Sequence, residues 1–178
     1  MVTIPIGIND KYKAGWERNI AMYTQRVGYT DEDDMPELKV NTISLPYTAT
    51  KEYLQAEEGV MSIGEYESTM TKLAAVTKLH QIVNGFAYVY DDDERLTVTL
   101  ERNKKLDWLK ANLTSEPTTI VYRFEADLDK IKQELNHIGR TFTEIVDDFK
   151  QGKSEILLLQ CSRCESFNLQ MCKRMIFY

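Results

Sequence analysis

Residues Ile156 to Leu159 form a short, uninterrupted apolar run, which limits the possible folds more than any other stretch. A strand with one face in water alternates apolar and polar side chains, whereas a strand covered on both faces does not. The run therefore predicts a strand buried on both faces, and we expect a second one at Met175 to Tyr178. The polar loop between them starts at the carboxyl end of the first strand, where open α/β sheets bind ligands.

Strand and helix patterns alternate from Thr118 onward. Residues Thr119 to Tyr122 predict a buried strand, and Ala126 to Ile138 predict a helix with one apolar stripe that stops at Gly139. A short strand at 141–146 and one helical turn at 147–151 are expected next. Because strands separated by helices form parallel sheets, the sequence predicts an α/β domain with a parallel sheet flanked by helices.

The first part of the chain has weaker patterns. Residues 9–27 carry apolar side chains at spacings of three and four, which predicts an amphipathic helix. The acidic run at 31–34 is interpreted as a solvated loop rather than a metal site, because adjacent carboxylates rarely converge on one ion. A strand is expected at 37–45, followed by a short helix capped by Thr48 or Thr50.

A longer helix and a hairpin are predicted between these two regions. Ser62-Ile63-Gly64-Glu65 has the form of a capping box and predicts the start of a helix that ends at Gly85. His80 falls among the apolar positions of this helix, so we expect a core or boundary histidine. Residues 86–100 alternate on both sides of an acidic turn and predict a β-hairpin. A helix is expected at 102–113.

Composition and charge narrow the possible functions. The chain of 178 residues is 43% hydrophobic and 28% charged, which is typical of a globular protein. We expect a cytoplasmic protein without a membrane partner, since no apolar run approaches membrane-spanning length and no signal peptide is apparent. The net charge of -6 argues against broad coating of nucleic acid. Basic residues outnumber acidic ones from Lys150 onward, which leaves room for a local basic groove.

The stretch from Glu155 to Tyr178 resembles the fifth conserved motif of superfamily-two helicases. The form is that of Swi/Snf-type ATPases and their phage and bacterial relatives: an apolar strand, a small-residue loop, Asn168-Leu169-Gln170 and another apolar strand. The sequence departs from the family at Cys164 and Ser166, where the family usually has glycines. Glycine supplies backbone freedom that cysteine and serine lack, so coupling through this loop is in question.

Other stretches extend the resemblance. Thr118 to Phe124 is similar to the family's fourth motif, and Asp148 to Gly152 is similar to the turn before the fifth. Asn103 to Leu109 is similar to the Lys-rich helix that precedes the first strand of the second lobe. The resemblance implies that residues 1–61 connect from a missing first lobe. It also implies that residues 62–178 are a RecA-like second lobe, incomplete at its C-terminus, with the hairpin 86–100 as an insertion.

The resemblance implies ATP and Mg²⁺ as cofactors of a complete two-lobed enzyme. This chain has no phosphate-binding loop: Gly59 to Gly64 has the glycine spacing, but Glu65 and Tyr66 follow where lysine and a hydroxyl residue are required. The acidic run at 31–34 follows no buried strand, and the family's arginine-bearing sixth motif lies beyond the fifth. We therefore expect that this chain binds no cofactor by itself and does not hydrolyse ATP alone.

The polar loop from Ser162 to Gln170 is the candidate functional site. In the family this loop faces the cleft between the lobes and touches the nucleic-acid backbone. The residues that carry over as candidate contacts to DNA or to the first lobe are Arg163, Glu165, Ser166, Asn168 and Gln170. Arg163 has the planar fork that pairs with a phosphate. The alternative is that Asn168 caps the loop and that the charged side chains are only solvated.

The three cysteines do not predict a metal site. Cys161-x-x-Cys164 has the spacing of a zinc knuckle, but structural zinc takes four ligands and Cys172 is the only other cysteine. We expect reduced, partly buried thiols and no metal.

Two functions remain open from the sequence. In the first, the chain is the second lobe of a phage-derived ATP-dependent DNA helicase or translocase in a bacterial cell. Its partners are then DNA, bound weakly through a local basic surface, and a first ATPase lobe in cis or in trans. In the second, it is a non-catalytic α/β module that binds a protein through its hairpin and exposed sheet.

Overall fold

The structure is a computed structural model that describes residues 39–178 except 93, 101–102, 164–166, 168 and 170. The chain divides into two units, residues 1–43 and 44–178. The helices and strands below belong to the second unit. The helix predicted at 9–27 and the acidic run at 31–34 lie outside the described residues.

The strand expected at 37–45 is wrong for its described part, because residues 39–50 form neither helix nor strand. Val40 is 78% exposed and no described strand pairs with this stretch, so the alternating side chains have nothing to pack on. The short helix that follows is confirmed as α2 (Lys51–Glu57). Thr50 caps it: the Thr50 side chain accepts a hydrogen bond from the N–H of Tyr53 at 3.3 Å.

The helix start predicted at Ser62 to Glu65 is wrong. These residues belong to a hairpin of β1 (Val60–Ile63) and β2 (Tyr66–Thr69), with Gly64 at φ +61° in its turn. Ser62 and Glu67 face each other across the hairpin, and the Ser62 hydroxyl bonds the Glu67 carboxylate at 3.4 Å instead of capping a helix. The helix α3 (Lys72–Val83) begins later, after Thr71, whose side chain accepts from the N–H of Ala74.

The hairpin predicted at 86–100 is confirmed as β3 (Phe86–Asp91) and β4 (Glu94–Thr99). Apolar side chains of the two hairpins form one small core around Met61, Ile63, Ala87 and Val89. The predicted apolar stripe of α3 is partly outside this packing, because Leu73 is 82% and Val76 51% exposed. His80 is also exposed, which excludes the core alternative of the prediction that it is a core or boundary histidine.

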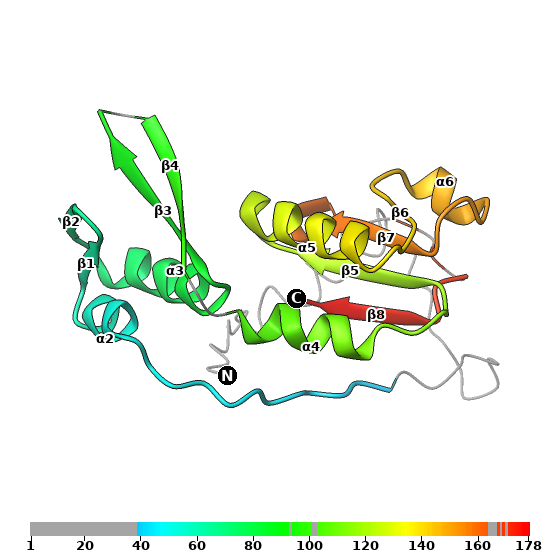
Figure 1. Ribbon diagram of the computed structural model, residues 1–178, viewed down its shortest axis with the longest axis horizontal. Coiled ribbons are helices and arrows are strands. Elements are labelled where there is room, and N and C mark those ends of the chain that lie inside the picture. The colour runs from blue at the N-terminus through cyan, green and yellow to red at the C-terminus, as the bar shows by residue number, and fades with distance from the viewer. Residues whose placement is uncertain (1–38, 93, 101–102, 164–166, 168, 170) are drawn as a thin grey trace, which may run out of the picture. The chain divides into compact units, whose positions relative to one another are not determined.

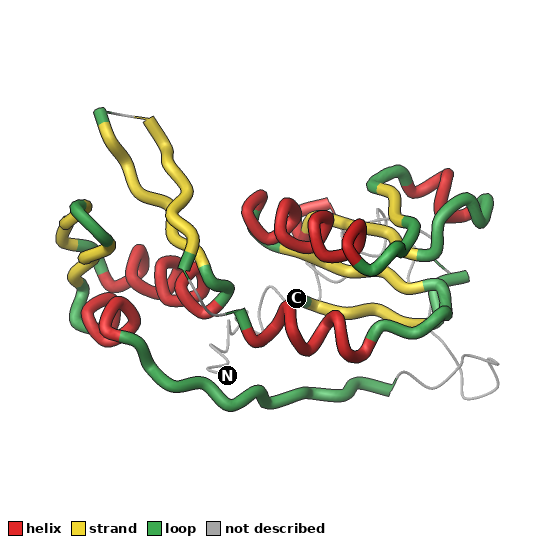
Figure 2. Tube along the Cα trace, viewed as in Figure 1, coloured by secondary structure: helices red, strands yellow, loops and turns green. Residues whose placement is uncertain are grey.

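The second half of the chain is an α/β fold with a parallel sheet flanked by helices, as predicted (Figure 1). Four parallel strands run in the order β6-β7-β5-β8. In chain order the elements are α4 (Lys104–Asn112), β5 (Thr118–Tyr122), α5 (Glu125–His137), β6 (Phe142–Thr143), α6 (Val146–Lys150), β7 (Ile156–Gln160), the 3₁₀ turn Cys161–Arg163 and β8 (Arg174–Phe177). Figure 2 shows the same alternation by colour. Of the strand predicted at 141–146, only Phe142–Thr143 is confirmed.

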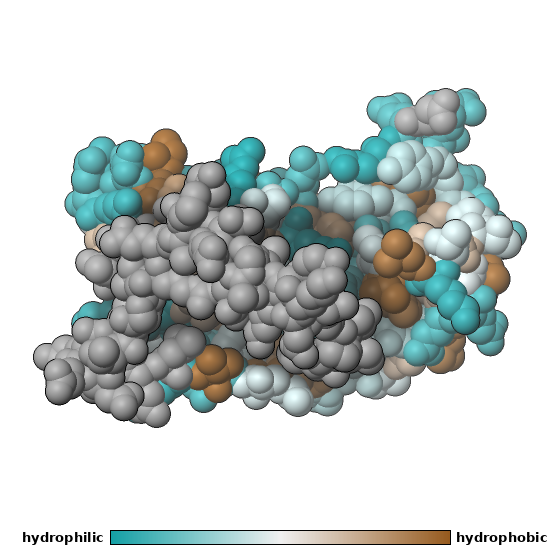
Figure 3. Space-filling model, turned by 180° about the vertical axis from the view of Figure 1, so that it is seen from behind, coloured by the Kyte–Doolittle hydropathy of each residue, from teal (hydrophilic) through white to brown (hydrophobic). Residues whose placement is uncertain are grey.

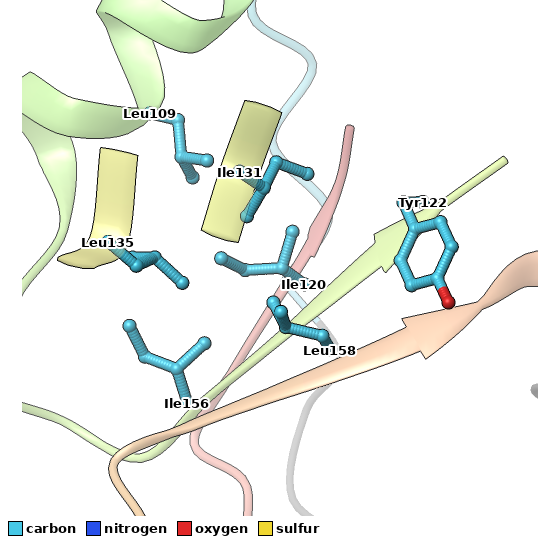
Figure 4. Close-up of a cluster of buried hydrophobic side chains, with 7 residues drawn as sticks. All are labelled: Leu109, Ile120, Tyr122, Ile131, Leu135, Ile156 and Leu158. Carbon is cyan, nitrogen blue, oxygen red and sulfur yellow. The ribbon is translucent and has the colours of Figure 1, made fainter. Parts of the chain in front are cut away.

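The two central strands are buried on both faces, as the apolar runs predict. On one face, Ile120 of β5 and Leu158 of β7 pack against Ile131 and Leu135 of α5 and against α4 (Figure 4). On the other face, odd-numbered residues of β7 pack against α6 and the segment before β8; the cluster is Phe149, Leu157, Leu159, Leu169, Met171 and Cys172. The connection after β5 therefore covers one face of the sheet, and the connections before and after β7 cover the other.

The expectation of a second strand buried on both faces at Met175 to Tyr178 is wrong. β8 is the outermost strand and pairs only with β5 among the described strands. Ile176 packs against the main core, whereas Met175 is 47% and Phe177 74% exposed on the opposite face. The space-filling view shows separate apolar patches of this kind on a largely hydrophilic described surface (Figure 3).

A buried polar network joins residues 60–99, which form the two hairpins and α3 and are called the hairpin region below, to the sheet. The carboxylate of Asp127 is 0% exposed and accepts hydrogen bonds from Asn84 Nδ2 at 2.9 and 3.1 Å and from the N–H of Phe124 at 3.2 Å. Asn103 Nδ2 donates to the backbone oxygen of Asn84 at 2.7 Å and to the Tyr178 hydroxyl at 2.6 Å. The network therefore links the ends of α3 and β8 to the starts of α4 and α5.

Replacing Asn84 with alanine tests this network. The change leaves a buried carboxylate without its side-chain donor, so we expect the free energy of unfolding to fall by about 2–3 kcal/mol in urea titrations. Asn112→Ala is the matched control: Asn112 is exposed, and its side chain bonds the Trp108 oxygen of its own helix, while its backbone oxygen, which accepts from Arg174, is kept in the variant. This change is expected to cost less than about 0.5 kcal/mol. Equal losses in the two variants would contradict a special role for Asn84.

The same carboxyl group predicts a pH dependence of stability. Burial raises the pKa of Asp127, although hydrogen bonds from Phe124 and Asn84 and the charge of Lys105 oppose the shift. A carboxyl whose folded pKa exceeds its unfolded value of about 3.9 stabilises the fold most when protonated, and this contribution is lost as pH rises through the folded pKa. In urea titrations from pH 4 to 7, Asp127→Asn is therefore expected to lose less stability with rising pH than the unmodified chain. If stability fell equally with rising pH in both proteins, Asp127 would not be the source of this pH dependence.

Candidate functional site

The strand order places a topological switch point at the carboxyl ends of β5 and β7. The chain leaves β5 through α5 toward β6, crossing one face, and leaves β7 toward β8, crossing the other. Tyr122 and Gln160 are paired in register, so the two strands end level with each other. Connections that diverge from neighbouring parallel strands mark the position where open α/β sheets bind ligands.

Two arginines follow these strand ends. Arg123 comes directly after β5, and Arg163 closes the 3₁₀ turn after β7; both side chains are exposed. Burial raises the pKa of Tyr122, Glu144 adds to this shift, and the positive charge of Arg163 opposes it. Among the described residues, the ion pairs involve neither Arg123 nor Arg163. The carboxyl ends of β5 and β7 are therefore followed by two arginines that form no ion pair with a described carboxylate.

Arg123 contacts a histidine from the hairpin region. The Arg123 guanidinium stacks at 5.3 Å from the Phe124 ring centroid, and its Nη1 lies 3.1 Å from His80 Nδ1. Because a guanidinium always donates, Nδ1 must accept, and the imidazole is neutral with its proton on Nε2. Partial burial of the ring lowers the pKa of His80, and the charges of Arg123 and Lys105 lower it further.

Of the five predicted contact residues, the structure describes only Arg163, which closes the 3₁₀ turn after β7. Glu165, Ser166, Asn168 and Gln170 lie outside the described residues. Leu169, between the last two, packs with Phe149, Leu157 and Leu159 on one face of the sheet. This contact gives the motif's apolar residue a structural role as the anchor of the loop.

Arg123 and His80 were not among the site residues predicted from the sequence. Arg123 had a usable signal, because it follows a buried strand just as Arg163 follows the next one. His80 had none, since its pairing with a residue 43 positions away depends on how α3 packs.

A small cavity in the described part of the chain lies away from the carboxyl ends of β5 and β7. It has a volume of about 180 Å³ and is lined by Pro117, Thr141, Phe149, Gly152, Lys153 and Glu155, among others. These residues lie where β5 and β7 begin, at the amino-terminal ends of the strands. Binding pockets for drug-sized ligands usually measure about 300–1,000 Å³, so this cavity is too small to be the main site.

Metal and nucleotide binding find no support among the described residues. They contain no group of three or more His, Cys, Asp or Glu side chains that could hold a metal ion. Cys161 is exposed, whereas Cys172 is half-buried with its Sγ 3.1 Å from the Thr119 hydroxyl; Cys164 is not described. The stretch Gly59 to Gly64 forms β1 and its turn instead of a loop before a helix, which does not fit a phosphate cradle.

Comparisons with known proteins add no family. The sequence matches no family model, and neither a curated protein nor a solved structure is significantly similar to it. No helix within the described ranges is long and apolar enough to cross a membrane.

Shortening Leu169 tests whether it anchors the loop. Leu169→Ala removes a half-buried side chain from the second face of the sheet, so we expect a loss of about 1–2 kcal/mol and faster hydrogen exchange at 161–173. Phe167→Ala, which removes a larger but 42% exposed side chain from the same loop, is the control and should change both much less. A larger effect from Phe167→Ala would show that the loop is anchored elsewhere.

Proposed function

We propose that this chain is the second lobe of a Swi/Snf-type ATP-dependent DNA helicase or translocase. In this role it contacts the DNA backbone and couples that contact to a first ATPase lobe, but it does not hydrolyse ATP by itself. The observation that carries the proposal is the pairing of β5 with β7. The segments that resemble the family's fourth and fifth motifs are these two strands, and an exposed arginine follows each.

This pairing supports the proposal because the two resemblances come from separate stretches. Residues 118–124 and 155–178 are far apart in sequence, and nothing in either pattern alone requires them to be neighbours. In the structure they lie side by side in register and end at the same edge. Motifs that serve one ligand must meet at one site, and the pairing of Thr118–Tyr122 with Ile156–Gln160 supports the proposal on this point.

The two arginines that follow β5 and β7 are suited to binding phosphate. A guanidinium is planar and offers five N–H donors, so it binds phosphate oxygens at two points. In the proposed mechanism Arg163 binds one backbone phosphate while the two lobes close, and releases it as they open. Alternating grip of this kind moves the protein along DNA.

ATP and Mg²⁺ enter the proposal only through a first lobe. The described residues supply neither a phosphate cradle nor a metal cluster, so no step of hydrolysis is assigned to this chain. The proposed setting is the cytoplasm of a bacterial cell, with the gene derived from a phage.

A second candidate, a non-catalytic protein-interaction module, is favoured by β8. The outer edge of β8 pairs with no described strand, and Phe177 is 74% exposed beside it. An open sheet edge with apolar side chains is a surface on which another chain can add a strand. Cys164 and Ser166, which replace the family's loop glycines, also fit a protein that has lost its coupling.

DNA binding over a salt series separates the two candidates. Fluorescence anisotropy with labelled single- and double-stranded DNA should show weak binding that falls as salt rises. Arg163→Gln should weaken it roughly tenfold and lower the slope against salt by about one released ion. Asn168→Ala is also expected to weaken it.

Lys153→Gln is the matched control, since it removes the same charge from the opposite edge of the sheet, where Lys153 is 60% exposed. It should leave the affinity within about twofold. No binding at low salt, or equal losses from Arg163→Gln and Lys153→Gln, would reject the DNA-binding lobe in favour of the interaction module.

A further inference from the structure

The contact between Arg123 and His80 gathers positive charge and hydrogen-bond donors on an exposed surface. The Arg123 guanidinium lies 3.1 Å from the neutral His80 imidazole, and the charge of Lys105 of α4 also acts on His80. The nearest acidic residue in sequence, Glu125, bonds Arg95 instead. Because no ion pair among the described residues involves Arg123, its charge can be neutralised by an anion that binds from outside.

We propose that Arg123 and His80 together bind one phosphate of the DNA backbone, separate from the phosphate held by Arg163. This inference rests on the proposed function, because it assigns the next contact along the same nucleic acid. It names a second phosphate position at the same sheet edge, formed between the main sheet and the hairpin region.

The donors are arranged for such a contact. The Phe124 ring holds the guanidinium plane of Arg123 at 5.3 Å, and the contact with His80 uses only one of its nitrogens. The remaining N–H groups of this exposed side chain can meet phosphate oxygens at two points. His80 adds Nε2–H as a donor in its neutral form and a second donor, Nδ1–H, when it is protonated.

The elements that carry these groups are fixed relative to each other. Asn84, at the end of α3, bonds Asp127 of α5, and Asp127 bonds the N–H of Phe124. Gln81, the neighbour of His80, accepts a hydrogen bond from the N–H of Tyr88 at 3.1 Å. His80 and Arg123 therefore do not have to be brought together when a ligand binds, which lowers the entropic cost of binding.

Phosphate binding at this position must be coupled to a proton. Partial burial, Arg123 and Lys105 lower the pKa of His80 in the free protein. A bound phosphate stabilises the imidazolium and raises that pKa, so DNA affinity should increase as pH falls through the titration of His80. The described charged groups that act on His80 are Arg123, from the end of β5, and Lys105, from α4.

The chain offers an internal control, because its only two histidines are His80 and His137. His137 lies in the last turn of α5, at the opposite end of that helix from Phe124, and is also exposed. NMR titration of both imidazoles, in chloride, in inorganic phosphate at the same ionic strength and with a short DNA duplex, reports on the two positions in one sample.

We expect DNA to shift the His80 signals and raise the pKa of His80, while His137 changes little. Arg123→Gln should abolish the shift at His80 and weaken DNA binding about tenfold. Arg123→Lys keeps the charge but loses the fork, so it should restore only part of both. Lys153→Gln should leave both unchanged. His80→Gln should remove the increase in affinity at low pH.

The outcomes separate this inference from the proposed function. If DNA binding depends on Arg163 but the His80 signals do not move, the second phosphate position is wrong and the DNA-binding lobe stands. If inorganic phosphate shifts His80 but DNA does not, the site binds a free anion and the assignment to the DNA backbone is wrong. If the chain binds no DNA at any salt concentration, both proposals fail. Equal shifts at His80 and His137 would show general ionic effects and would also reject the site.

Discussion

The buried carboxylate of Asp127 holds the end of α3 against the start of α5. Its hydrogen bonds hold Asn84 at the end of α3 and the N–H of Phe124 at the start of α5. Arg123 immediately precedes Phe124, and His80 lies one helical turn before Asn84, so one anion sets the positions of both side chains. Burying a charge is costly unless it is hydrogen-bonded, which explains the amide, the backbone N–H and the nearby lysines around it.

The sheet meets a different requirement, which is to place two loops at one edge while covering both faces. The order β6-β7-β5-β8 sends the connection after β5 over one face and the connection after β7 over the other. Each connection brings its own apolar side chains: α5 supplies Ile131 and Leu135, and the segment before β8 supplies Leu169 and Met171. Packing and loop placement therefore follow from the same topology.

The sequence predicts the elements whose patterns persist over several residues. The central strands, α5, the hairpin β3-β4 and the parallel sheet were all available from periodicity and from the uniform run at Ile156 to Leu159. The pattern at Ser62 to Glu65 led to a wrong prediction, because a hydroxyl and a carboxylate three residues apart occur at hairpin turns as well as at helix starts. Gly64 has a positive φ, which favours the turn. The exposure of Phe177 could not be predicted, since an apolar strand does not reveal whether it lies at an edge.

The candidate site is predictable to a similar extent. Arg163 follows from its place after a buried strand, and Arg123 follows by the same reasoning. The partner of Arg123 does not, because only the packing of α3 beside β5 brings His80 within reach. The roles of Glu165, Ser166, Asn168 and Gln170 remain predictions from the resemblance.

The strand order also has a consequence for how the chain is made. Among the described strands, β5 pairs only with β7 and β8, and β6 pairs only with β7, so the first two strands of this sheet in chain order are not neighbours. Until Ile156 to Gln160 have been synthesised, β5 has neither of its strand partners. Formation of the sheet therefore depends on contacts between residues far apart in sequence, which close late and slow folding.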